Sequence, residues 1–327
     1  MRFRHNILVI LFLSSVVAIS GAAGLASQER APQTKPEQRR QQDQDQVLRL
    51  SSQLILVPVS ASDATGRPVP NLTADDFIIE EEGQPQRIVS LGEPGKAPTD
   101  IALLFDISGS IHAQFPFEQQ AAVRFIRQVI KPTDSVSVFS IGVTPKMIRP
   151  RTSRSDDAVS GVMAITPKEG EPTALFDSIV QASLYLGGDA DSGSRRVLLA
   201  ISDGEENYSK QHALNDALRE LQKNDCLFYS INPSGPALTL NKVSIKGQDT
   251  METMSSQTGG KAFVPARIED LDAVFNQIAQ ELQAQYLFGY YSSDERLDGS
   301  FRRITVRAPN RPDLRVRARQ GYYARKS

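Results

Sequence analysis

The chain has 327 residues, of which 40% are hydrophobic and 23% are charged, as is usual for a soluble globular protein. This composition excludes a wholly disordered chain, and the length is sufficient for two domains of ordinary size. Lys and Arg number 37 against 38 Asp and Glu, so the net charge of -1 gives no general reason to expect nucleic-acid binding. The single cysteine, Cys226, excludes an intrachain disulfide and a zinc site built on several thiolates.

The first 26 residues have the pattern of a signal peptide. Arg2 and Arg4 precede an apolar run of about 13 residues, and small residues follow it up to Ala26. The run is shorter than the roughly 20 residues that a membrane helix needs. We therefore expect residues 1–26 to direct export and to be removed, which places the mature chain in the periplasm or outside the cell. An uncleaved segment that anchors the chain to a membrane is the alternative.

Residues 27–47 are predicted to form a disordered linker. They are rich in Gln and in charged groups and almost lack apolar side chains, so ordering them would bury too little surface to offset the lost chain entropy. Residues 48–95 then change to short β-type runs separated by turn signals. This pattern predicts an N-terminal β-strand region.

From residue 98 to 283 the pattern alternates between strands and helices. The runs 101–105, 196–201 and 226–231 are continuously apolar, which is typical of strands buried on both faces of a parallel sheet. A further strand is predicted at 135–141, and apolar spacing predicts helices at 119–130, 156–165, 174–186, 212–223 and 268–282. This alternation predicts an α/β fold, with a doubly wound, mostly parallel, Rossmann-like sheet flanked by helices.

Residues 284–327 return to β-strand patterns, at 286–291, 302–307 and 314–323. This region and 48–95 are each only about 40 residues long and would be marginally stable alone. We expect the two to pack together as one β-rich domain, with the α/β domain inserted between them; two separate β modules are the alternative. Apolar residues alternate with arginines in the last strands, which predicts a solvated face rather than a polyanion site.

Oxygen-bearing side chains follow two of the buried strands. Asp106, Ser108 and Ser110 form a D-x-S-x-S motif after the first strand, and Asp203 follows the strand at 196–201. The carboxyl ends of parallel strands share one edge of the sheet, where ligands bind in open α/β folds. Thr173 stands at the predicted start of a helix. Such oxygens suit Mg²⁺, although each residue alone is equally typical of a turn or a helix cap.

Together these residues resemble the metal-ion-dependent adhesion site (MIDAS) of von Willebrand factor type A (VWA) domains. The likeness spans roughly residues 100–283 and includes the Gly-Gly pair at 259–260. The flanking segments 57–77 and 289–323 are similar to those of a bacterial exported VWA subfamily. One departure is Pro172, which stands where Gly is common in the family. The resemblance implies a VWA fold whose metal ligands are Asp106, Ser108, Ser110, Thr173 and Asp203, and whose cofactor is Mg²⁺, with Mn²⁺ or Ca²⁺ as alternatives.

The same pattern indicates binding rather than catalysis. Two carboxylates balance the charge of the ion, and an open position then favours an Asp or Glu carboxylate from a protein partner. Hydrolysis needs a base near the ion, and the sequence offers only Glu205 and His112. It contains no G-x-S-x-G, phosphate-binding Gly-rich or H-E-x-x-H motif.

We therefore expect an exported, non-enzymatic adhesion module that binds a protein ligand and no nucleic acid. Two alternatives remain open at this point. One is a metal-dependent hydrolase that uses the same site, and the other is a scaffold subunit whose metal is purely structural.

Overall fold

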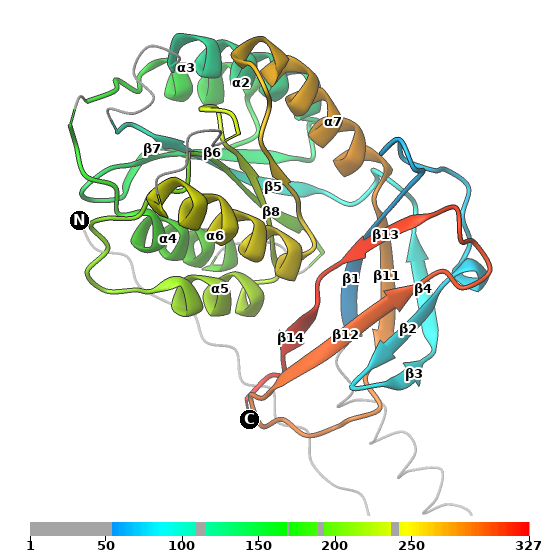
Figure 1. Ribbon diagram of the computed structural model, residues 1–327. Helices are drawn as coiled ribbons and strands as arrows, with labels where there is room; N and C mark the ends of the chain where they lie inside the picture. Colours follow the sequence, from blue (N-terminus) through cyan, green and yellow to red (C-terminus); the bar gives the residue numbers. More distant parts are fainter. Residues whose placement is uncertain (1–53, 109–114, 169, 189–192, 237–241, 327) are drawn as a thin grey trace, which may run out of the picture. The chain divides into compact units, whose positions relative to one another are not determined.

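The computed structural model describes residues 54–108, 115–168, 170–188, 193–236 and 242–326 (Figure 1). The predicted signal peptide and linker, residues 1–26 and 27–47, lie outside this part of the chain. Within the described residues, no helix combines the length and the apolarity needed to cross a membrane.

A six-stranded sheet forms the centre of the α/β region, in the order β10-β9-β8-β5-β6-β7. Its strands are β5 (Thr99–Asp106), β6 (Ser135–Ile141), β7 (Lys146–Thr152), β8 (Arg195–Ile201), β9 (Cys226–Ile231) and β10 (Ala262–Phe263). All neighbours pair in parallel except β7, which is antiparallel to β6. Every residue of β5 is buried, as the continuous apolar run predicted. The expected doubly wound, mostly parallel α/β fold is confirmed.

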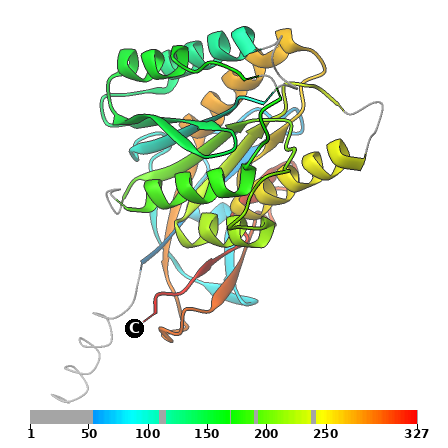
Figure 2. The ribbon, with the colours of Figure 1, turned by 90° about the vertical axis from the view of Figure 1, so that its left-hand side faces the viewer.

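Helices cover both faces of this sheet (Figure 2). One face carries α2 (Phe115–Val129), α3 (Ser155–Met163) and α7 (Leu271–Ala284), which follows the short 3-10 helix η3 (Ile268–Asp270). The other face carries α4 (Leu175–Gly188), α5 (Leu214–Lys223) and α6 (Lys242–Thr258). Successive β5 residues point to opposite faces, so Leu103 packs in the first apolar cluster and Leu104 in the second.

The edge strand β7 was not predicted from the sequence pattern. Its segment contains Pro150 and three basic residues, and much of it is exposed. Proline and charge are tolerated only where one side of a strand is free of hydrogen bonds. The pairing with β6 accordingly shifts register twice along its length.

Two four-stranded antiparallel sheets form the β-rich part, in the orders β13-β1-β11-β4 and β14-β12-β2-β3. The N-terminal strands are β1 (Leu54–Ser62), β2 (Ile78–Glu81), β3 (Gln84–Gln86) and β4 (Ile88–Gly92), with a 3-10 helix η1 (Ala74–Asp76) after β1. The C-terminal strands are β11 (Tyr286–Tyr291), β12 (Phe301–Arg307), β13 (Arg315–Ala318) and β14 (Gly321–Tyr323).

The two ends of the chain share these sheets (Figure 1). Strand β1 lies between the C-terminal strands β11 and β13, and β2 pairs with the C-terminal β12. One apolar core, which includes Val57, Ile79, Phe288 and Ile304, takes side chains from both sheets. The predicted strand at 314–323 is divided into β13 and β14, because the chain passes there from one sheet to the other.

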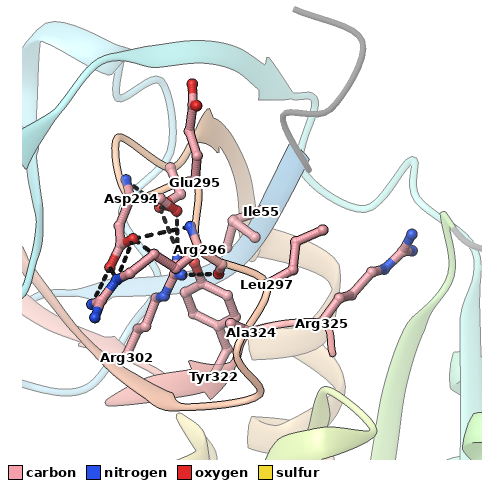
Figure 3. Close-up of a pocket in the computed structure, with 10 residues that line it drawn as sticks. Ile55, Asp294, Glu295, Arg296, Leu297, Arg302, Tyr322, Ala324 and Arg325 are labelled. Atoms are coloured by element: carbon pink, nitrogen blue, oxygen red, sulfur yellow. Dashed lines mark hydrogen bonds and ion pairs between the residues drawn. The ribbon is translucent and has the colours of Figure 1, made fainter. Parts of the chain in front are cut away.

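The arginines of the C-terminal strands do not all face solvent, as the strand pattern had suggested. Arg302 and Arg319 are buried. The Arg302 guanidinium pairs with Glu81 at 3.5 Å. It also donates to the backbone carbonyls of Asp294 and Arg296 (Figure 3). The pocket in Figure 3 has a volume of only about 20 Å³, too small for any ligand larger than water. Arg302 thus connects β12 with its neighbour β2 and with the loop after β11, and the Arg319 guanidinium donates to the Leu56 carbonyl on β1 at 2.7 Å.

Glu281, near the end of α7, connects the α/β region with the β sheets. Its carboxylate accepts a hydrogen bond from Ser60 Oγ on β1 at 3.0 Å. It also accepts hydrogen bonds from the Tyr229 hydroxyl on β9 and from the Arg317 guanidinium on β13. Only one residue, Gln285, separates α7 from β11, and its side-chain amide donates to Ser60 at 3.2 Å.

Deleting residues 286–327 is expected to unfold the strands at 54–92. The deletion removes both neighbours of β1 and the C-terminal partner of β2, which leaves too few strands to bury an apolar face. Limited proteolysis with mass spectrometry checks this, because the segment should become as sensitive as an unfolded peptide. Retained protease resistance of 54–92 would mean that the N-terminal strands fold without the C-terminal ones.

Replacing Arg302 with Met is expected to lower the free energy of unfolding by about 3–5 kcal/mol, because Glu81 then keeps a buried charge without its counter-ion. Arg303→Met, on the exposed side of the same strand, is the matched control and should change it by less than about 0.5 kcal/mol. Urea unfolding measures both variants. If both substitutions change the free energy of unfolding equally, the buried Arg302–Glu81 pair does not stabilise the fold.

Candidate metal centre

Strands β5 and β8 lie side by side and end at the same edge of the sheet. Phe105 pairs with Ile201 in the register, so the residues that follow leave the two strands at neighbouring positions. Ser202 Oγ donates to Asp106 Oδ2 at 2.7 Å, and the Ser108 backbone N–H donates to Asp106 Oδ1 at 3.0 Å. The Asp106 side chain is therefore fully buried and oriented from both sides.

Backbone hydrogen bonds attach the Thr173 segment to this edge. The Lys168 N–H donates to the Ile107 carbonyl at 2.9 Å, and the Ala174 N–H donates to the Gly142 carbonyl at 2.9 Å. The Thr173 N–H donates to Asn207 Oδ1 at 2.8 Å, and the Thr173 carbonyl accepts the Asn207 N–H at 3.2 Å. The segment before α4 is thus bonded to the loops that follow β5, β6 and β8.

Four of the five predicted ligands are described, and each lies in one of these connected segments. Asp106 is the last residue of β5 and Ser108 follows it, Asp203 follows β8, and Thr173 precedes α4. All four side chains are largely buried, and Asp203 is 8% exposed. Ser110 lies outside the described residues, as does the candidate base His112.

The acids at this edge repel one another. Burial raises the pKa of Asp106 to about 6, against hydrogen bonds from Ser202 and Ser108 that lower it, and the charge of Asp203 adds to the increase. Burial and then the charge of Asp203 also raise the pKa of Glu205. Like charges this close to one another are unfavourable unless a cation compensates them.

A third buried acid, Glu118, is influenced by the charges of Asp106 and Asp203 and was not predicted. It lies in the first turn of α2, and its side chain is fully buried. Neither of its carboxylate oxygens has a hydrogen-bond partner among the described residues. Burial, and after it the charges of Asp106 and Asp203, raise its pKa to about 9. The apolar spacing predicts a helix that begins at 119, whereas α2 begins at Phe115, so Glu118 falls outside the predicted helix.

A signal for Glu118 was nevertheless present in the sequence. The apolar stripe of this helix contains Ala122, Phe125 and Val129. Extending that stripe backwards by four residues from Ala122 reaches Glu118. A carboxyl group at an inward position of a helix that starts directly after the D-x-S-x-S loop points to the site rather than to solvent.

The chemistry of these donors fits a hard divalent cation. Carboxylate and hydroxyl oxygens are the ligands that Mg²⁺ and Ca²⁺ select in proteins. In the described ranges, no three His, Cys, Asp or Glu side chains lie close enough together to hold one ion. A cation would therefore depend on the two aspartates, with hydroxyl groups and water completing its oxygen shell. Repulsion among the buried acids is the structural observation that such a cation would relieve.

A cleft of about 600 Å³ lies between α4 and the segments 143–145 and 208–212. Its wall includes Tyr208, whose N–H donates to the Thr173 carbonyl at 3.1 Å, and a stripe along α4 from Asp177 to Leu184. Asp177 accepts a hydrogen bond from His212 Nδ1 at 2.8 Å, which orients that ring within the cleft. Apolar and polar groups both line this surface, so it suits a peptide segment better than a simple ion.

Comparison with known proteins gives a family match and several structural likenesses. The model of the von Willebrand factor type A domain matches residues 100–279. An aerotolerance-related membrane protein from Bacteroides fragilis is similar, at 20% identity, over 56% of this chain and 98% of that chain, with a TM-score of 0.43. No curated protein matches the chain.

Two further solved structures are similar at lower identity. The vWF domain of the type V pili tip protein Mfa5 from Porphyromonas gingivalis is 12% identical, over 56% of this chain and 94% of that chain, with a TM-score of 0.45. Proximal thread matrix protein 1 from the mussel byssus, in a structure with a zinc-occupied MIDAS motif, is 15% identical, over 62% of this chain and 49% of that chain, with a TM-score of 0.48.

The family match covers more than half of the chain. It begins at the second residue of β5 and ends within α7, so it coincides with the six-stranded sheet and its flanking helices. The chain therefore belongs to the von Willebrand factor type A domain family.

Proposed function

We propose that this chain is an exported, non-enzymatic binding protein whose VWA domain holds a divalent cation and uses it to bind a carboxylate of a protein partner. The observation that supports this best is the pair of aspartates, Asp106 and Asp203, at the ends of adjacent parallel strands. The Thr173 segment is hydrogen-bonded to the same edge. Mg²⁺ is the first candidate because every donor is a hard oxygen, and Mn²⁺ or Ca²⁺ are the alternatives.

The proposed ligands are Asp106, Ser108, Ser110, Thr173 and Asp203, some of them through water. When bound, the ion supplies a positive centre for a partner's Asp or Glu carboxylate. The chain's own contribution is to hold its carboxylates in fixed positions: Asp106 through Ser202 and Ser108, and Asp203 through the Glu205 N–H, which donates to it at 3.0 Å. A site held in this way loses little conformational entropy when the ion binds.

Export is proposed from residues 1–26, with removal of this signal segment and a periplasmic or secreted mature chain. The proposed organisation is a linker at 27–47, a VWA domain at 98–283, and a β-rich domain formed by 48–95 with 284–327. The shared sheets support the last point, since β1 lies between two C-terminal strands.

Two observations favour binding over hydrolysis. The backbone of Glu205, the described candidate base, bonds to the proposed ligand Asp203, and its side chain is only partly buried. His212, the one histidine within the described residues, is already paired with Asp177 in the cleft. The cleft along α4, whose wall includes Tyr208, gives the residues that flank a partner's carboxylate a surface to contact, which a hydrolase of small esters would not need.

Asp106→Asn and Asp203→Asn are expected to lower Mg²⁺ affinity at least about tenfold, because each removes a negative ligand while keeping the side-chain volume. Titration calorimetry with Mg²⁺, repeated with Mn²⁺, measures this. Asp134→Asn is the matched control: Asp134 is a buried aspartate at the opposite end of β6 that accepts backbone N–H groups of Thr99 and Lys131. The control should lose stability and keep its affinity for the ion.

Carboxylate binding is tested with immobilised peptides that carry one Asp or Glu, compared with the same peptides carrying Asn or Gln. We expect retention only on the acidic peptides, only with Mg²⁺ present, and not after EDTA. Turnover of a phosphoester or peptide that Asp106→Asn abolishes would identify a hydrolase instead. A large fall in melting temperature with EDTA, without any carboxylate binding, would indicate a purely structural metal.

A further inference from the structure

Glu118 is the one acid of the described α/β region that is fully buried and has no partner for either of its carboxylate oxygens. Two other buried acids show the contrast. Asp134 accepts the Thr99 N–H at 2.9 Å and the Lys131 N–H at 3.0 Å. Glu81 accepts the hydroxyl groups of Tyr290 at 2.7 Å and Tyr322 at 3.1 Å. A buried polar group without hydrogen bonds destabilises a fold, and a buried carboxylate does so more strongly.

The position of Glu118 indicates what compensates this destabilisation. Its carboxyl group is near enough to Asp106 and Asp203 for both charges to act on it. Glu118 therefore keeps a buried, unpartnered carboxyl group at a position of α2 where a neutral glutamine or an apolar side chain would suit the isolated fold better. A neutral carboxylic acid would donate its proton to an acceptor, and the described residues provide none for Glu118.

Glu118 is not placed to act as a third direct carboxylate ligand. No trio of acidic, His or Cys side chains in the described part of the chain lies close enough to share one ion. Its contact with a cation would consequently run through water, in the way that outer partners of metal ligands usually act. Such outer partners orient the residues that bind the ion directly and the water molecules around it, and charged ones add charge to the site.

We propose that Glu118 is a positioning residue of the cation site, which adds a third negative charge and accepts hydrogen bonds from the water between α2 and the ion. This inference rests on the proposed function, because it presupposes a cation bound by Asp106 and Asp203. It goes beyond that function in assigning a role to a residue outside the D-x-S-x-S, Thr and Asp pattern. The ligand class remains a hard divalent cation, now in a site with three acids.

The test compares Mg²⁺ and Mn²⁺ binding by calorimetry in the full mature chain and in Glu118→Gln and Glu118→Met. We expect both variants to bind the ions about 10- to 100-fold more weakly. Without an ion, Glu118→Met should melt at a higher temperature than the unchanged protein, because it removes an unpaired buried acid and keeps the volume. Glu118→Asp keeps the charge and should recover part of the affinity.

Glu81→Gln is the control, since it alters a buried glutamate of the β sheets that accepts hydrogen bonds from Tyr290 and Tyr322. It should lower the melting temperature and leave ion affinity unchanged. Unchanged affinity in both Glu118 variants, with normal binding by the parent chain, would overturn the role of Glu118 alone. Absence of ion binding in the parent chain would overturn the proposed function itself, so the two failures are distinguishable.

Discussion

The parallel register of β5 and β8 is the constraint on which the proposed site depends. It places Asp106 and Ser202–Asp203 at neighbouring ends of buried strands, where helices on both faces exclude water from the strand interior. Carboxylates at such a position cannot separate without breaking the sheet. The chain therefore keeps an electrostatic repulsion that a smaller or apolar side chain would have removed, and burial together with the charges of Asp106 and Asp203 raises the pKa of Glu118. A divalent cation is the ligand that turns this repulsion into attraction.

Strand order and hydrogen bonds join the two β sheets to the VWA domain. Because β1 lies between β11 and β13, the N-terminal strands are completed only after the whole α/β region has been synthesised. Glu281 then ties the last helix of the VWA domain to β1, β9 and β13 through Ser60, Tyr229 and Arg317. Long-range pairing of this kind makes folding slow, and it holds the two regions together through buried polar contacts.

Much of the fold was predictable from the sequence, because buried parallel strands and amphipathic helices leave strong periodic patterns. The predicted strands at 135–141, 226–231 and 286–291 coincide with β6, β9 and β11. Edge strand β7 carries no such pattern. Arg302 turns inward because it pairs with Glu81, which is far away in the sequence but lies on the neighbouring strand β2. For the site, the sequence predicts which strand ends meet. It does not predict the hydrogen bond between Thr173 and Asn207 or the burial of Glu118, because both depend on packing between segments.

The central claim is that one cation is held between the ends of β5 and β8, and a crystal structure grown with Mn²⁺ tests it most directly. The account predicts a single strong anomalous peak bounded by Asp106, Thr173 and Asp203, with water between the ion and Glu118. No peak at this edge at saturating Mn²⁺, or a peak bound by other residues, would contradict it.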